Sequence, residues 1–198
     1  MGMSGVQLLS NWDYIVRFEN LCFAKNNNNT FDTGKGIQHT YFPPNLEYIG
    51  DSAFFRGGIK LASELPETLV YIGASAFCYG GNSNMRFTKL PPNLTYIGND
   101  AFRGYFIFEK IIVPATVDYI GTGAFSGDYH KTSLKEIVFK GIPSTIGNTA
   151  FSNNTSLVDI YVPWAEGAVA NAPWGATNAT IHYNTQYDAD GNPIIEEV

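Results

Sequence analysis

Residues whose chemistry could support catalysis are few and scattered in this chain. The histidines are His39, His130 and His182, and no motif places a base beside a serine or cysteine. Asp128 and His130 share one segment, but exposed loops commonly contain such residues. The DADG sequence at 188–191 begins like a calcium loop, yet it lacks the later ligands, so we expect a turn. We therefore expect no enzyme activity, no catalytic or metal-binding residues and no cofactor.

Composition excludes several classes of partner. The 198 residues are 44% hydrophobic and 15% aromatic, which is enough for a packed core. The net charge is −6 and the 12 lysines and arginines form no basic run, so we expect no binding to nucleic acid or to anionic membrane surfaces. No segment approaches the roughly 18 apolar residues of a membrane-spanning helix, so we expect no membrane insertion.

Two further features concern the compartment of the chain. The N-terminal segment has neither the charge nor the long apolar core of a secretion signal. Either the chain is not secreted by that route, or its signal is not part of this sequence. Cys22 and Cys78 lie outside any motif; one disulfide remains open, and two buried thiols are the favoured interpretation.

One phrase without any of these chemical residues is repeated along the chain. The motif Ile-Gly-x-x-Ala-Phe occurs five times, and its copies start 23 to 26 residues apart. In the first four copies a proline stands six residues before the isoleucine, an aliphatic residue three before it and a tyrosine directly before it. The copies occupy 49–54, 72–77, 97–102, 120–125 and 146–151. This period predicts a solenoid, because one unit cannot bury its own apolar face and stacked units can.

Each repeated position has a physical reason. An alternating run such as Leu-x-x-Ile-x-Val at 157–162 predicts a short strand with one face directed inward. Proline ends that strand because it has no N–H group to donate. Glycine suits a corner where φ is positive or where neighbouring backbones approach closely. Alanine followed by phenylalanine supplies one small and one large core residue per unit, so that stacked units interlock.

The extended pattern Leu-x-x-Ile-x-Val-Pro-x-x-Val-x-x-Ile-Gly-x-x-Ala-Phe resembles the BspA-type leucine-rich repeats of bacterial surface proteins, some protists and prophage-encoded proteins. The resemblance spans residues 37–162, about two thirds of the chain, and the segment that follows is similar to the ends of such arrays. It implies a right-handed, mostly β solenoid of the leucine-rich-repeat type, with a parallel sheet on one face and short strands and turns opposite. For function it implies recognition and adhesion, with no common catalytic activity.

The chain divides into four expected parts. A solenoid must cover its terminal apolar faces, so we expect an N-terminal cap over 1–36 and a C-terminal cap over 164–184. Between them we expect a repeat array over 37–163, comprising the five copies and a closing strand, and after them a tail or hairpin over 185–198.

Two segments receive more specific expectations. In the C-terminal cap we expect a short helical turn that packs Trp164 and Trp174 on the last repeat, followed by a final strand over 179–183. In the fifth copy Lys140 takes the proline position and Pro143 the leucine position. We expect local distortion there, and the register of that copy stays open.

Three groups of residues are candidates for contact with a partner. The tyrosine column predicts either an exposed ladder, spaced at about 4.8 Å, that stacks on sugars or a protein, or a ladder that only shields the solenoid. The second group points out of the predicted strands; its apolar C-terminal half forms either a contact site or a surface covered by the C-terminal segment. The third lies in or beside two insertions at one corner, the edge where repeat proteins often bind partners, although unconstrained drift explains insertions as well. The candidates are Tyr48, Tyr71, Tyr96 and Tyr119 in the first group, Tyr41, Ile112, Val138 and Tyr161 in the second, and Tyr79, Asp128, Tyr129 and His130 in the third.

The sequence therefore predicts a non-enzymatic recognition or adhesion module, outside the cell or on its surface. It would bind a host or bacterial surface protein, or a glycan, through the faces and edge loops of a rigid solenoid. The alternative is a phage or prophage component, tail-associated or receptor-binding and carried on the virion. An accessory region of a larger enzyme is a third class, and it requires a catalytic domain elsewhere in the polypeptide.

Overall fold

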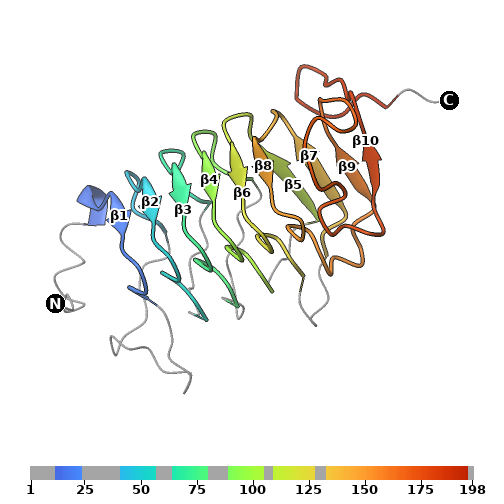
Figure 1. Ribbon diagram of the computed structural model, residues 1–198. Coiled ribbons are helices and arrows are strands. Elements are labelled where there is room, and N and C mark those ends of the chain that lie inside the picture. The colour runs from blue at the N-terminus through green and yellow to red at the C-terminus, as the bar shows by residue number, and fades with distance from the viewer. Residues whose placement is uncertain are drawn as a thin grey trace.

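The chain forms a parallel β-solenoid of stacked coils, as the sequence predicts. The structure is a computed structural model, and it describes residues 12–23, 41–56, 64–79, 89–104, 109–127 and 133–195. A short 3-10 helix, η1 (Trp12–Tyr14), precedes the first strand. From there the coils follow one another in a single row, with β1 near one end and β10 at the other (Figure 1).

A six-stranded sheet runs along the row as far as Thr145–Ile146, in the fifth motif copy. All its strands are two residues long and parallel. The first residues of neighbouring strands pair with one another and are mostly tyrosines, and the second residues pair in the same way and are mostly isoleucines. Its order is β1-β2-β3-β4-β6-β8. The strands are β1 (Arg17–Phe18), β2 (Tyr48–Ile49), β3 (Tyr71–Ile72), β4 (Tyr96–Ile97), β6 (Tyr119–Ile120) and β8 (Thr145–Ile146).

A four-stranded parallel sheet covers a second side of the C-terminal coils (Figure 1). Three of its strands come from the apolar runs before Pro114, Lys140 and Pro163. Burial alternates along the first of them, Lys110–Val113, whereas three consecutive residues are buried in the second, Glu136–Phe139. Its order is β10-β9-β7-β5, so β10 is an edge strand. The strands are β5 (Lys110–Val113), β7 (Glu136–Phe139), β9 (Asp159–Tyr161) and β10 (Thr180–His182).

The repeated isoleucine, alanine and phenylalanine form one continuous core. None of these side chains in the five copies is more than 2% exposed. The phenylalanine rings stack face to face along the solenoid, with centroids 5.2 to 5.7 Å apart. Each ring therefore packs against two coils, and stacking supplies the burial that a single coil lacks.

The motif glycine is required by close approach between coils. A Cβ at this position would lie 2.4 to 2.7 Å from a backbone atom of the preceding coil. The positive φ values of the corner fall two residues later, at Ser52, Ser75 and Asp100. Glycine is suited to positive φ and to close approach of backbones, and at this motif position the close approach is the reason that applies.

The prolines begin hydrogen-bonded turns that are tied to the preceding coil. In each of the first four copies the aliphatic residue donates its N–H to the proline carbonyl at 3.1 to 3.2 Å. The side chain before it reaches back one coil: Asn93 Nδ2 donates to Glu67 O at 2.9 Å, and Thr116 Oγ1 donates to Pro92 O at 2.7 Å.

The fifth copy keeps its register despite its altered turn. Pro143 stands where the aliphatic residue is expected, and without an N–H it cannot close the turn. The strand that follows nevertheless pairs Thr145 with Tyr119 and Ile146 with Ile120. Gly141 permits a tighter path, because a Cβ there would lie 2.6 Å from Ala115 Cα.

The solenoid begins earlier than residue 37, inside the segment expected to act only as a cap. β1 pairs with β2 in the repeat register, with Arg17 beside Tyr48 and Phe18 beside Ile49. Phe23 then stacks on Phe54 with centroids 5.2 Å apart and planes 12° apart. The segment 17–23 is therefore a coil whose sequence departs from the motif.

The C-terminal segment closes the array without a helix. Trp164 and Trp174 are buried, as expected, but 164–178 follows turns in place of the expected helical turn. Trp174 takes the place of a motif alanine: its N–H donates to Asn171 O, and its carbonyl accepts from Phe151 N at 2.9 Å. β10 confirms the final strand, and the tail turns back as a hairpin in which Tyr187 pairs with Pro193.

Candidate functional site

The four tyrosines of the six-stranded sheet form a tight stack, here called the tyrosine ladder. Successive ring centroids lie 4.5, 4.6 and 4.7 Å apart, and the ring planes are within 9° of parallel. The Arg17 guanidinium lies 3.9 Å from the centroid of the Tyr48 ring and covers the N-terminal end of the stack. At the other end Thr145 replaces the tyrosine in the register.

Stacking determines which parts of these rings a partner can reach. The faces between neighbouring tyrosines are covered by other rings, while each side chain remains partly exposed. A sugar could therefore stack on a ring face only at the Tyr119 end of the ladder. Along the rest of the ladder the ring edges and phenol groups face outward.

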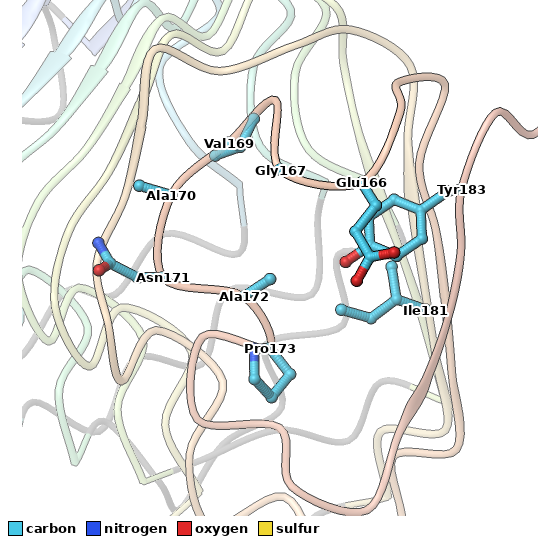
Figure 2. Close-up of a pocket in the computed structure, with 9 residues that line it drawn as sticks. All are labelled: Glu166, Gly167, Val169, Ala170, Asn171, Ala172, Pro173, Ile181 and Tyr183. Carbon is cyan, nitrogen blue, oxygen red and sulfur yellow. The ribbon is translucent and has the colours of Figure 1, made fainter.

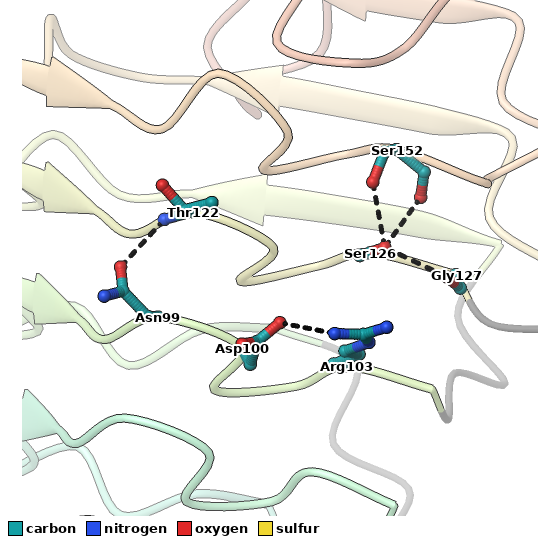
Figure 3. Close-up of polar contacts among 7 residues, drawn as sticks. All are labelled: Asn99, Asp100, Arg103, Thr122, Ser126, Gly127 and Ser152. Carbon is teal, nitrogen blue, oxygen red and sulfur yellow. Dashed lines mark hydrogen bonds and ion pairs between the residues drawn. The ribbon is translucent and has the colours of Figure 1, made fainter.

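The ladder is flanked by exposed columns with acidic residues on both sides. Glu47, Val70 and Asp118 precede ladder tyrosines, and Val70 is 38% exposed. On the other side, corner side chains hold the coils together: Asn99 Oδ1 accepts from Thr122 N at 2.9 Å (Figure 3). In the same way Asp51 Oδ1 accepts from Ala74 N at 2.8 Å.

The two central tyrosines of the ladder, Tyr71 and Tyr96, have raised pKa values. Partial burial, together with neighbouring Tyr48, Tyr96 and the Asp51 carboxylate, raises the pKa of Tyr71 to about 12. Burial also raises the pKa of Tyr96, with smaller contributions from Tyr119 and Asp51. Neutral phenols both donate and accept hydrogen bonds, so the ladder offers a row of such groups at neutral pH.

The outward column of the four-stranded sheet is largely covered, although the sequence leaves open whether it is a contact site or a surface covered by the C-terminal segment. Val138 is fully buried and Tyr161 is only 7% exposed, whereas Tyr41 is 46% exposed and Ile112 is intermediate. The Tyr161 ring stacks on the His182 ring with centroids 4.4 Å apart. Val138 therefore offers a partner no side-chain surface, and Tyr161 very little.

The C-terminal hairpin is anchored at the end of the same sheet. The Tyr187 hydroxyl donates to Phe139 O at 2.6 Å, and the Lys140 ammonium lies 3.9 Å from the centroid of the Tyr187 ring. Lys140 also donates to Gly191 O. These contacts agree with the alternative that the C-terminal segment covers part of this surface.

Polar clusters in the described part of the chain serve structure. The Ser126 hydroxyl is 3% exposed and contacts Gly127 O at 3.0 Å, Ser152 O at 3.2 Å and Ser152 Oγ at 2.9 Å (Figure 3). A buried hydroxyl held by carbonyl oxygens is not an accessible nucleophile. His182 Nε2 lies 2.8 Å from Asp159 Oδ1, a hydrogen-bonded contact between adjacent strands.

The insertion candidates are only partly visible. Asp128, Tyr129 and His130 lie outside the described residues, as does His39. Tyr79 is half-buried, and its ring centroid lies 6.2 Å from that of Phe55 and 5.8 Å from the Arg56 guanidinium. Cys22 and Cys78 are free thiols, and burial raises the pKa of Cys22 to about 12.

A hollow at the C-terminal end of the solenoid was not expected from the sequence. It measures about 390 Å³ and lies between the segment 166–173 and strand β10 (Figure 2). Ile181 and Tyr183 line one side, Ala172 and Pro173 another, and Glu166 stands at its margin. No residue pattern in 164–183 indicates a hollow, because it depends on how 166–173 packs beside β10.

The described residues contain neither a metal-binding cluster nor a membrane-spanning helix. Across the ranges given above, no group of three or more His, Cys, Asp or Glu side chains is placed to hold a metal ion. Within the same ranges, no helix has the length and apolar character needed to cross a bilayer.

The comparisons with known proteins identify the repeat. The chain matches the family described as BspA type Leucine rich repeat region (6 copies), over residues 14–79 and 59–167. These overlapping matches cover well over half of the chain, and they include the first coil at 17–23. Neither the curated proteins nor the solved structures gave a match. Solenoids of this family are typically binding scaffolds, which supports a recognition or adhesion module, and the chain belongs to the BspA-type leucine-rich-repeat family.

Proposed function

We propose that the tyrosine ladder and its acidic flanks are the contact surface of a non-enzymatic recognition module, and that the partner is a protein. The observation that carries this proposal is the stack itself. It presents phenol groups at 4.5 to 4.7 Å intervals on a scaffold already fixed by stacking. A preorganised surface loses little conformational freedom on binding, and tyrosine is enriched where proteins meet.

The chemistry of the ladder favours a protein over a glycan. Sugar recognition by aromatic residues uses ring faces, and here those faces are covered by neighbouring rings. Phenol hydroxyls beside Glu47, Asp51 and Asp118 suit a partner with amide and basic groups. Members of this family are typically surface-associated in bacteria, which supports placing the interaction at the cell surface with a host or bacterial surface protein.

A double variant tests the contact surface. Tyr71→Ser with Tyr96→Ser removes the centre of the ladder, and Tyr14→Ser is the matched control because Tyr14 is 83% exposed and lies outside the ladder. We expect a panel of immobilised surface proteins to contain a partner that the double variant binds at least about tenfold more weakly, while the control binds normally. Thermal melts of all three proteins separate lost contact from unfolding.

Other outcomes of this experiment overturn parts of the proposal. Equal binding by the folded double variant would remove the ladder as the contact surface. Binding only on a glycan array would replace the protein partner with a carbohydrate. A stable trimer measured by light scattering, together with detection of the protein on virions, would favour the phage component instead.

A further inference from the structure

The hollow at the C-terminal end lies where a further coil would place its inward side chains. Ile181 and Tyr183 pack partly against the core from β10, and Ala172 and Pro173 face the same space from the preceding segment (Figure 2). In the interior of the array, the equivalent space is filled by residues of the next coil, such as Ile160 and Val162. The end of the solenoid therefore offers an open hollow of about 390 Å³, with the apolar side chains of Ile181 and Ala172 among its lining and Glu166 at its margin.

The strand beside this pocket has one unpaired edge. β10 is the last strand of its sheet, and its hydrogen bonds to the neighbouring coil use alternate residues: Thr180 N donates to Val158 O, and His182 O accepts from Val162 N. In a parallel ladder the intervening residues direct their N–H and C=O groups to the other edge. For Ile181 and Tyr183, no described residue supplies a strand on that side.

One charged side chain lines the pocket, and it is acidic. It belongs to Glu166, and none of the lining residues is a lysine or arginine. Glu166 is exposed and lines the pocket together with Tyr183. Burial raises the pKa of the Tyr183 phenol, and the Glu166 carboxylate raises it further, so the charge of Glu166 acts directly on this space.

We propose that the C-terminal end of the solenoid is a second binding site, which takes an extended, basic segment of a partner protein. The segment pairs its backbone with the free edge of β10, as in other cases of strand addition. One of its apolar side chains enters the pocket against Ile181 and Tyr183, and a lysine or arginine pairs with Glu166. This site is separate from the tyrosine ladder and does not depend on it.

A peptide library is the direct probe of this site. Random ten-residue peptides are selected on the immobilised chain, and peptides that also bind the Glu166→Lys variant are removed. We expect the selected peptides to alternate apolar residues and to carry a lysine or arginine. Labelled copies should bind the chain at least about tenfold more tightly than they bind Glu166→Lys. Hydrogen exchange should slow at the Ile181 and Tyr183 amides when a peptide is bound.

Matched variants make the outcome specific. Glu67→Gln changes an exposed glutamate far along the chain and should leave peptide affinity unchanged, whereas Glu166→Gln should weaken it. The Tyr71→Ser, Tyr96→Ser double variant should also keep the affinity, so failure of the ladder does not affect this test. Selected peptides without basic residues, equal affinity for Glu166→Lys, or exchange protection elsewhere would each overturn the proposal. Self-association of the chain that is lost in Glu166→Lys would overturn it too, and assign the site to a second copy.

Discussion

At the scale of single residues, the ladder tyrosines combine packing with an exposed polar group. The rings of Tyr71 and Tyr96 are covered on both faces by their neighbours, yet these side chains stay partly exposed. Partial burial and nearby Asp51 penalise the phenolate form, so the pKa of Tyr71 is raised to about 12. Burial has the same effect on Tyr187, whose pKa is also raised to about 12. Folding therefore favours the protonated form of both side chains.

These raised pKa values predict a loss of stability in alkaline solution. An unfolded tyrosine ionises near pH 10, so between about pH 10 and 12 the unfolded chain releases protons that the folded chain retains. The free energy of unfolding should be constant with respect to these groups below pH 10 and should fall as the pH rises to 12. Tyr71→Phe should make this fall shallower. Urea unfolding at a series of pH values measures both slopes, and identical slopes would contradict the assignment.

At the scale of the repeating element, the coil corner depends on how closely two backbones approach. Gly98 lies against the preceding coil, where an added Cβ would be 2.5 Å from Ala74 N and 2.6 Å from Gly73 C. Neither contact can be relieved by rotating a side chain. The glycine column therefore sets the distance between coils, and the side-chain bonds of Asn99 and Asp51 hold the same corner together.

Gly98→Ala should consequently destabilise the solenoid strongly. Overpacking costs about 1–3 kcal/mol, and we expect about 3 kcal/mol because the backbone itself must move. Asn148→Ala, an exposed change at the corner of a later coil, should alter the free energy of unfolding by less than about 0.5 kcal/mol. Denaturant titration of both variants measures the difference. A neutral Gly98→Ala would show that the coils can separate without cost.

At the scale of the whole molecule, the described residues of the two halves of the array are built differently. The N-terminal coils are joined in the six-stranded sheet by strands of only two residues. The C-terminal coils add the four-stranded sheet and a cluster of Phe139, Phe151, Trp164 and Trp174, whose ring centroids lie 5.2 to 6.4 Å apart. Because coils contact only their neighbours, local stability should follow this difference.

Phe102→Ala should therefore expose the uneven stability of the array. Phe102 is 2% exposed and stacks between Phe77 and Phe125, so the truncation should cost about 3–5 kcal/mol. Weakening this central contact should let amides of β2 and β3 exchange much faster than those of β7 and β9. Hydrogen exchange by mass spectrometry measures the two groups separately, with Val158→Ala as an exposed control. Equal acceleration in both groups would mean that the array unfolds as one unit.

The repeat and its core could be predicted from the sequence because stacking makes equivalent positions alike. Isoleucine, alanine and phenylalanine recur since each copy meets the same neighbours, and the structure buries all of them. The first coil does not match the motif because Phe18, Glu19 and Cys22 stand at its isoleucine, glycine and alanine positions, and only Phe23 keeps the motif residue. The faint signal was the motif phenylalanine, with an aromatic residue in the isoleucine position.

The properties of the surface were decided only by the tertiary structure. Whether the ladder rings expose faces or edges depends on distances between residues more than 20 positions apart in the chain. From the sequence Val138 and Tyr161 are expected to point outward, yet both are buried, and the His182 ring stacks on that of Tyr161. The terminal hollow exists because no described residue continues the stack beyond β10. Local sequence specifies which way a side chain points, but what lies in front of it depends on segments distant in the chain.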